Sequence, residues 1–348
     1  MLPDVTTQEA GPASSDSGPV VDSGAKVADA TTRDTGSGIA EASVPDAPRV
    51  TEGGVACGTR TGKRGLTPRT LTAGGLSRTY LAYVPANLDP ATPVPLVYVF
   101  HGFTMSGQEM HDITHYADLA DSEGFAVVFP DGQGGPLSLA APWNVENPGQ
   151  TVCGAGQVEN ATGDDNAFID AMKADVSLDQ CLDPAHVYAT GFSMGGYLSH
   201  HIGCVRTDFR AIAPHSGGTI ADLSSCQTGH VPVIILHGTS DEFIADGCDD
   251  PNGTAQSGFP PSATLWATKN GCQLTYTTIV ADGDAGGNGQ CYLYDGCPAD
   301  GQVELCTFTS MPHVWAGGDQ AGGNGLLAGP TYASATELTW AFFKKYAW

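Results

Sequence analysis

Short apolar runs alternate with longer amphipathic stretches along the chain from Cys57 onward. Short runs bounded by Gly, Pro or polar clusters are typical of buried strands, whereas apolar residues three or four positions apart predict helices. The predicted strands are Thr79–Val84, Leu96–Phe100, Phe125–Phe129, Val187–Thr190, Val231–Leu236 and Val303–Phe308. The predicted helices are Gln108–Ser122, Asp164–Leu178, Met194–Val205, Ser262–Asn270 and Ala333–Tyr346. This alternation indicates an α/β protein with a mostly parallel central sheet flanked by helices.

Residues 1–54 lack this alternation. They contain no aromatic residue, and their nine acidic residues face only three basic ones. Such a segment buries too little apolar surface to offset the entropy of ordering it. We therefore expect a disordered acidic linker at 1–54, either a tether or a dispensable extension, followed by a single α/β domain at 55–348. Two Gly-rich stretches within that domain, 282–289 and 316–329, are predicted loops.

The charge balance excludes two classes of partner. Lys and Arg number 14 against 38 Asp and Glu, which gives a formal net charge of −24. Such a chain repels phosphate backbones and anionic lipid surfaces, so we expect neither nucleic-acid binding nor attraction to membranes. No apolar run approaches the roughly 20 residues that a membrane-spanning helix needs.

The ten cysteines indicate an oxidising compartment. None of them forms a C-x-x-C pair, so their spacing gives no support to a zinc site. An even number of cysteines in a chain of this size favours disulfides and therefore a secreted protein. The start, Met1-Leu2-Pro3-Asp4, lacks the basic and apolar regions of a signal peptide, so we expect that a leader has been removed.

One motif predicts a nucleophile. Gly191-Phe192-Ser193-Met194-Gly195 has the pattern G-x-S-x-G and lies between a predicted strand and a predicted helix. A tight turn at this place holds the serine above the sheet, and the helix N-terminus favours a developing oxyanion. Ser193 is therefore the candidate nucleophile, and the alternative is a serine that only caps the helix.

The order of residues along the chain selects the acid and the base. Triads of this type run Ser, then Asp or Glu, then His, and His313 is the only histidine after residue 237. The acid should follow the strand Val231–Leu236, where Asp241 fits best and Glu242 and Asp246 are alternatives. Asp241 would orient the His313 ring, which would take the Ser193 proton and pass it to the leaving alcohol.

Two backbone N–H groups are the candidate oxyanion hole. One belongs to Met194, which follows the nucleophile. The other belongs to the loop after Leu96–Phe100, where we expect the N–H of Phe103, with that of Thr104 as the alternative. Such a triad needs no metal ion or cofactor, and we expect none. Asp282-Gly283-Asp284 is acidic but lacks calcium-loop spacing.

A series of short motifs runs from about Arg78 to His313. These are Arg78-Thr79-Tyr80, Val84-Pro85, His101-Gly102, Phe129-Pro130-Asp131-Gly132, Trp143-Asn144, Asp164-Asp165-Asn166-Ala167-Phe168-Ile169, Cys181-Leu182-Asp183, the serine motif, Ala211-Ile212-Ala213-Pro214, His237-Gly238-Thr239-Ser240-Asp241, Asn270-Gly271-Cys272 and His313-Val314-Trp315. Through these motifs the chain resembles secreted esterases grouped around polyhydroxybutyrate depolymerases and D-type feruloyl esterases, in the first carbohydrate esterase family.

This resemblance implies an α/β-hydrolase fold in which Ser193, Asp241 and His313 act as the triad. It also implies that Cys272 pairs with a cysteine of the 291–306 cluster, for which we name Cys297. The family commonly has Gly before the catalytic His and Trp-Pro after it, whereas this chain has Pro312 and Trp315-Ala316. These departures concern the shape of the loop rather than the triad.

The substrate follows less directly. We expect a monomer that hydrolyses feruloyl or acetyl esters on plant xylan, with Trp143, Trp315 and Phe103 lining an aromatic-friendly cleft. The alternative substrate is a polyhydroxybutyrate-type polyester. A serine peptidase on the same fold and a non-catalytic binding module are the competing classes. The sequence shows no propeller or other gating domain that would indicate a serine peptidase. A non-catalytic binding module would usually have lost a triad residue, whereas all three candidates are present here.

Overall fold

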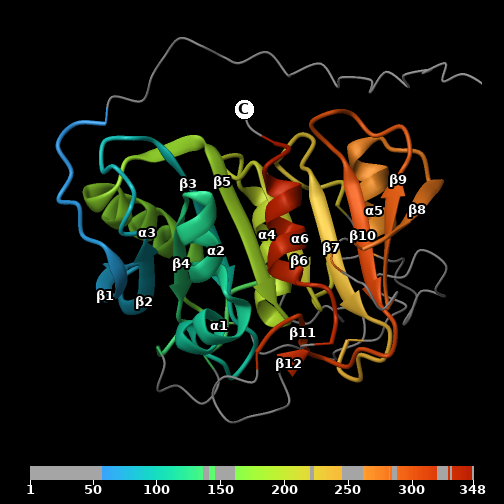
Figure 1. The fold of residues 1–348 in the computed structure, drawn as a ribbon, viewed down its shortest axis with the longest axis horizontal. Coiled ribbons are helices and arrows are strands. Elements are labelled where there is room, and N and C mark those ends of the chain that lie inside the picture. Colours follow the sequence, from blue (N-terminus) through green and yellow to red (C-terminus); the bar gives the residue numbers. More distant parts are fainter. Residues whose placement is uncertain are drawn as a thin grey trace, which may run out of the picture. The chain divides into compact units, whose positions relative to one another are not determined.

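The computed structural model describes residues 57–135, 141–145, 161–219, 223–244, 262–281, 283, 288–319, 328–329 and 331–346. The linker expected at 1–54, the alternative acid Asp246 and most of the two Gly-rich stretches lie outside these residues. The described residues all belong to one unit, Gly53–Trp348. The structure has the α/β-hydrolase arrangement that the sequence predicts (Figure 1).

Ten strands form one sheet in the order β1-β2-β4-β3-β5-β6-β7-β10-β9-β8. The six strands from β4 to β10 in this order are parallel, and the two strands at each end are antiparallel to their neighbours. The strands are β1 (Gly65–Ala73), β2 (Leu76–Val84), β3 (Val94–Phe100), β4 (Ala126–Pro130), β5 (Leu182–Phe192), β6 (Ala211–His215), β7 (Val233–Gly238), β8 (Tyr276–Val280), β9 (Gly289–Tyr294) and β10 (Val303–Phe308). Two short strands, β11 (Trp315–Ala316) and β12 (Ala328–Gly329), pair separately.

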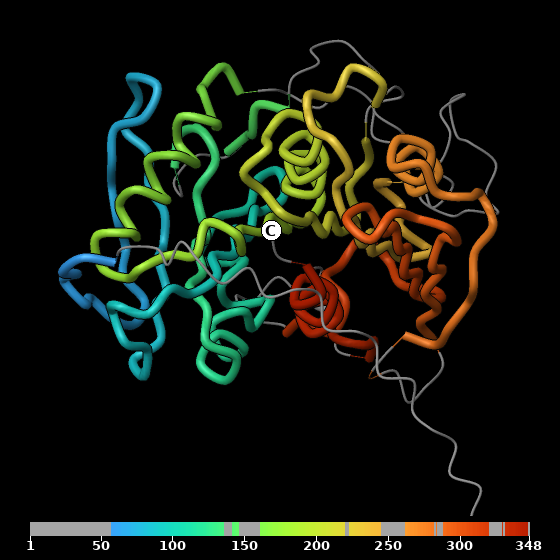
Figure 2. Tube along the Cα trace, turned by 90° about the horizontal axis from the view of Figure 1, so that it is seen from above, coloured from blue at the N-terminus to red at the C-terminus, as the bar shows by residue number. Residues whose placement is uncertain are grey.

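Helices cover both faces of the sheet. They are α1 (Gly107–Thr114), α2 (Tyr116–Glu123), α3 (Asp165–Asp179), α4 (Met194–Val205), α5 (Ser262–Asn270) and α6 (Ala335–Phe343). Figure 2 shows α3, α4 and α5 on one side and α1, α2 and α6 on the other. Because both faces are covered, central strands such as β3 are apolar along most of their length rather than alternating.

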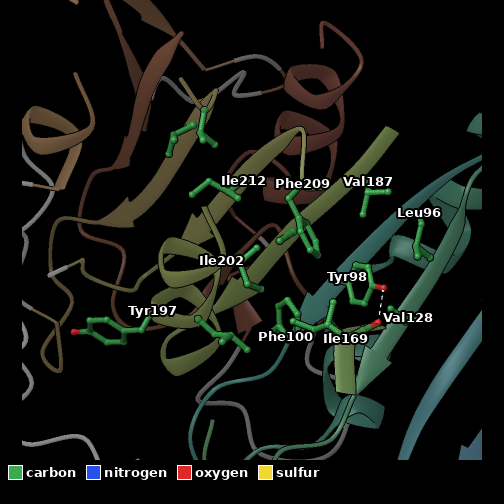
Figure 3. Packing of buried hydrophobic residues seen from close by; sticks show 14 of the residues in the cluster. Leu96, Tyr98, Phe100, Val128, Ile169, Val187, Tyr197, Ile202, Phe209 and Ile212 are labelled. Carbon is green, nitrogen blue, oxygen red and sulfur yellow. Dashed lines mark hydrogen bonds between the residues drawn. The ribbon is translucent and has the colours of Figure 1, made fainter. Parts of the chain in front are cut away.

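Each face has its own hydrophobic core. The core under α3, α4 and α5 contains Phe168, Ile202 and Trp266, and Figure 3 shows Tyr98 and Phe100 of β3 packing into it. The Tyr98 hydroxyl donates to the carbonyl of Ile169, which satisfies this buried polar group. The opposite core contains residues of α1, α2 and α6. The two cores hold the sheet rigid beneath the loops that follow its strands.

The predicted helix Gln108–Ser122 is two helices in the structure. The chain turns at His115, which has φ 58° and separates α1 from α2. At this break the carbonyl of Thr114 accepts a tertiary hydrogen bond from the Thr336 hydroxyl, while the Thr114 hydroxyl donates to the carbonyl of Met110 within α1. The helical periodicity of the sequence continues across this break and therefore could not reveal it.

Candidate active site

Ser193 occupies a strained turn between β5 and α4. Its backbone has φ 54° and ψ −115°, and its N–H donates to the carbonyl of His215 at 2.9 Å. The glycines of the motif allow this turn to pack closely. A Cβ at Gly195 would lie 2.2 Å from the Phe100 carbonyl oxygen, and one at Gly191 would lie 2.5 Å from the Gly195 carbonyl oxygen. Strain of this kind in a non-glycine residue is typical of functional sites.

Asp241 and His313 are brought together from two neighbouring parallel strands. Asp241 follows β7 and His313 follows β10, so both lie at the carboxyl-terminal edge of the sheet that also carries Ser193. The Nδ1 atom of His313 lies 2.6 Å from Oδ2 of Asp241. Because a carboxylate can only accept, Nδ1 carries the hydrogen and Nε2 is left with a lone pair. The ring of His313 also lies 4.6 Å from that of Phe192, the neighbour of Ser193.

The Asp241 carboxylate is buried and fully hydrogen-bonded. Its Oδ1 accepts the N–H groups of Phe243, at 3.0 Å, and Ile244, at 2.8 Å. Its Oδ2 lies 3.4 Å from Nε2 of His237, in addition to His313. Burial alone would raise the pKa of the Asp241 carboxyl, but the hydrogen bonds from His237 and His313 outweigh it and hold that pKa below its usual range. Asp241 is therefore ionised beside His313.

His237 is buried near the carboxyl end of β7, and its side chain also faces the candidate acid. Its Nε2 atom lies 2.9 Å from the carbonyl oxygen of Ile244 and faces Asp241 as well. Both neighbours are acceptors, so Nε2 carries the hydrogen. Sequence reasoning missed this contact, although the four-residue spacing between His237 and Asp241 after a strand was visible.

Glu242, the alternative acid, lies near the base but does not contact its ring. Its Oε2 accepts the backbone N–H of His313 at 3.4 Å. The structure thus brings Asp241 to the imidazole and Glu242 to the main chain of the same residue. This geometry favours Asp241 for orienting the ring.

The loop after β3 approaches the serine. A Cβ at Gly102 would lie 3.1 Å from Cβ of Ser193, so a glycine here lets the backbone approach the serine without a tight contact. Gly102 to Met105 form a turn in which the Met105 N–H donates to the Gly102 carbonyl and Thr104 has φ 67°. A positive φ at the third residue is the signature of a type II turn.

His101 fixes the peptide that carries the Phe103 N–H. Its Nε2 accepts the Gly132 N–H at 2.8 Å, so its Nδ1 carries the hydrogen and donates to the Gly102 carbonyl at 2.7 Å. Burial lowers the pKa of His101 to about 4, which keeps this arrangement neutral. In a trans peptide the N–H points opposite to the C=O, so the N–H of Phe103 faces away from His101. Within the described residues, neither this N–H nor that of Met194 has a protein acceptor.

Trp143 and Trp315 do not line a cleft in this structure. Trp143 is fully buried, and its indole N–H donates to the His101 carbonyl at 2.8 Å. Trp315 is 2% exposed, and its N–H donates to the Thr336 hydroxyl at 3.2 Å. Burial therefore leaves neither indole a surface for a ligand, and each indole N–H instead donates to a neighbouring segment of the chain.

Two phenylalanines are exposed near the candidate triad instead. Phe103, which the sequence named, is 38% exposed, and Phe243 is 62% exposed. The Phe243 ring lies 5.2 Å from that of His313. Sequence reasoning missed Phe243, and its position two residues after the acid was the only available signal.

Four disulfides join cysteines of the described part of the chain. They are Cys57–Cys181, Cys204–Cys226, Cys272–Cys297 and Cys291–Cys306, and the third is the pair that the resemblance implied. Cys153 and Cys248 lie outside the described residues. In the same described ranges, no group of His, Cys, Asp or Glu side chains is arranged to hold a metal ion. No helix there is long and apolar enough to cross a membrane.

Comparisons with known proteins identify related hydrolases and esterases. Residues 80–252 match the model of the dienelactone hydrolase family. Feruloyl esterase C of Emericella nidulans is 31% identical over 220 residues, which cover 60% of this chain and 68% of that protein. A probable feruloyl esterase C of Aspergillus oryzae is 33% identical over 202 residues, covering 57% and 64%. A bifunctional acetylxylan esterase/xylanase of Neocallimastix patriciarum is 32% identical over 171 residues, covering 49% and 22%.

Solved structures also share the fold. The acetyl xylan esterase from Aspergillus awamori matches with a TM-score of 0.52 and 17% identity, over 74% of this chain and 97% of that one. The chain is an α/β-hydrolase, and it belongs to the esterase family that includes feruloyl esterase C. It spans about two thirds of the length of the feruloyl esterases named above.

Proposed function

We propose that this protein is a serine carboxylic ester hydrolase whose triad is Ser193, His313 and Asp241. The observation that carries the proposal is the 2.6 Å hydrogen bond from His313 to Asp241. It sets the imidazole tautomer that leaves Nε2 able to accept a proton. The strained turn at Ser193 and the contact of His313 with Phe192 support the same assignment.

The reaction begins with attack of the Ser193 hydroxyl oxygen on the ester carbonyl carbon. His313 accepts the hydroxyl proton at Nε2, and Asp241 stabilises the imidazolium that results. The N–H groups of Met194 and Phe103 donate to the developing oxyanion, and donors of this kind contribute on the order of 3 kcal/mol each. Collapse of the intermediate breaks the ester C–O bond, and His313 gives its proton to the leaving alcohol.

Water completes the cycle. His313, again neutral, takes a proton from a water molecule that attacks the acyl-enzyme, and the second tetrahedral intermediate uses the same two N–H donors. The carboxylic acid leaves, and Ser193 recovers its proton. Every proton in this scheme is moved by residues of the chain.

We propose feruloyl or acetyl esters of plant xylan as the substrate class. The names of the relatives from Emericella nidulans and Neocallimastix patriciarum support these two acyl groups. The exposed rings of Phe103 and Phe243 beside the triad favour an aromatic acyl group, because aromatic pairs gain energy beyond simple burial.

A substrate panel tests the proposal. Initial rates on methyl ferulate, acetylated xylan, polyhydroxybutyrate and a casein peptide are measured with the wild-type protein and with Ser193→Ala as the blank. We expect hydrolysis of the first two and a loss on the order of 10⁴-fold or more in the variant, since the triad fails as a unit. Preference for polyhydroxybutyrate would replace the xylan assignment, and preference for the peptide would overturn the esterase proposal. A folded Ser193→Ala protein with full activity would overturn the triad.

A further inference from the structure

A buried histidine outside the proposed triad is bonded to both the nucleophile turn and the base loop. His215 ends β6 and is fully buried. Its backbone carbonyl accepts the N–H of Ser193 at 2.9 Å. Its side-chain Nε2 lies 3.1 Å from the backbone N of Ala316, three residues after His313. His215 is thus bonded both to the turn that carries Ser193 and to the loop that follows His313.

The hydrogen bonds fix the tautomer of His215. The Ala316 N–H can only donate, so Nε2 is the acceptor and Nδ1 carries the hydrogen. That Nδ1 lies 3.1 Å from the Ser216 hydroxyl oxygen, which can accept from it. Burial, with the neighbouring His237 and His313, lowers the pKa of His215 well below that of a free imidazole, although Asp241 opposes this shift. The ring therefore keeps its lone pair for Ala316.

The aromatic contacts of the His215 ring involve the same two segments as its hydrogen bonds. It stacks on Trp315, with centroids 4.7 Å apart and planes at 23°. Its other aromatic neighbour is Phe192, at 5.7 Å, which also contacts His313. Trp315 follows the base by two residues, and Phe192 precedes the nucleophile. The imidazole of His215 therefore lies between the neighbours of Ser193 and of His313.

The base loop is anchored differently on its two sides. Before His313, the acid loop holds it: the Ser240 N–H donates to the Met311 carbonyl at 3.0 Å, and the Ser310 N–H donates to the Thr239 hydroxyl at 2.9 Å. After His313, β11 pairs with β12 and the Trp315 indole donates to Thr336, while the Ala316 N–H donates to the side chain of His215. Removing that acceptor would leave the Ala316 N–H buried without its partner, a cost that favours movement of the loop.

We propose that His215 is a positioning residue that sets the distance between His313 and Ser193. It ties both segments to the end of one strand, so a change in its Nε2 contact moves the base relative to the nucleophile. The proposal rests on the triad proposed above, but it concerns a residue that neither accepts nor donates a proton in the reaction. Misplacement by about 1 Å can cost on the order of 100-fold in rate, so small movements suffice.

Two substitutions separate the acceptor from the ring. His215→Phe keeps an aromatic ring between Trp315 and Phe192 but removes the acceptor. His215→Gln loses the ring but places Oε1 near the position of Nε2. We expect kcat on a p-nitrophenyl ester to fall about 10- to 100-fold in His215→Phe with KM within about two-fold. We expect His215→Gln to recover kcat to within about three-fold of wild type, because it restores the acceptor.

The matched control is His200→Phe. His200 is also buried and accepts an indole N–H from Trp266 at 2.9 Å, but it lies on α4 away from the base loop. This control should lower the melting temperature while leaving kcat within about two-fold, because it removes a buried hydrogen bond of the same kind. Loss of kcat in His215→Phe without loss in His200→Phe therefore reports on position rather than on general stability.

The outcomes are distinct. Wild-type kcat in folded His215→Phe, or equal loss in His215→Phe and His215→Gln, would overturn the positioning role and leave the triad intact. If His215→Phe fails to fold, His215→Asn replaces it, since its shorter side chain does not reach Ala316, and the same loss is expected. Full activity of Ser193→Ala would instead remove the proposed function on which this inference depends.

Discussion

At the scale of single residues, the candidate site depends on which carboxylate orients His313. The two candidates are adjacent in the sequence, and spacing alone could rank them only by preference. The structure separates them, because Asp241 accepts from the ring at 2.6 Å while Glu242 accepts from the main chain at 3.4 Å. Asp241 is also buried, and its two oxygens face three donors besides His313, so its charge is fixed in place.

Asp241→Asn and Glu242→Gln form a matched pair for this assignment. An amide at 241 can donate to His313 and so favours the tautomer with its hydrogen on Nε2, which cannot accept from Ser193. We expect kcat to fall by about 10³- to 10⁴-fold in Asp241→Asn, with KM little changed. Glu242→Gln retains an acceptor for the His313 N–H and should keep kcat within about three-fold. If Glu242→Gln is the crippling change, the acid is misassigned by one position.

At the scale of elements, the sequence predicted the central strands and helices better than the edges. β10, α4 and α5 have the predicted bounds, because each is a continuous apolar or amphipathic segment between polar breaks. β6 was not predicted as a strand because Pro214 lies within it. The outer strands β1 and β8 were also missed, and most of their side chains are half-exposed or exposed in the structure.

The residues of the candidate site were also predictable only where the local sequence pattern was informative. Order along the chain placed Ser193, Asp241 and His313 as candidates because each follows a recognisable strand. The contacts of His215 and Phe243 depend on how distant loops meet, and a local pattern does not contain that information. Trp143 and Trp315 show the converse: aromatic character suggested a ligand surface, whereas their burial depends on tertiary packing.

At the scale of the whole molecule, the buried neutral histidines near the site make the free energy of unfolding depend on pH. Burial is the largest cause that lowers the pKa of His101, to about 4, and of His215. Free imidazole has a pKa of about 6.5, so below that pH the unfolded chain binds protons that the folded chain does not. The free energy of unfolding therefore falls as pH decreases from about 6.5, by up to about 1.4 kcal/mol per pH unit for each such histidine.

Comparison of wild type with His215→Gln isolates this effect from the changing repulsion of a chain of net charge −24. Urea unfolding at pH 7, 6 and 5 should show a shallower loss of stability in the variant, by about 1.4 kcal/mol per pH unit below pH 6.5. Parallel curves for the two proteins would show that His215 binds protons equally in the folded and unfolded states.

The most direct test of the triad is to find which atom becomes covalently modified. A fluorophosphonate probe reacts with an activated serine, and peptide mass spectrometry locates the adduct. We predict one adduct per chain, on the peptide that carries Ser193, with none in Ser193→Ala and slower labelling in His313→Gln because the base is lost. An adduct on another residue of the wild-type protein, or labelling of His313→Gln at the wild-type rate, would contradict the account.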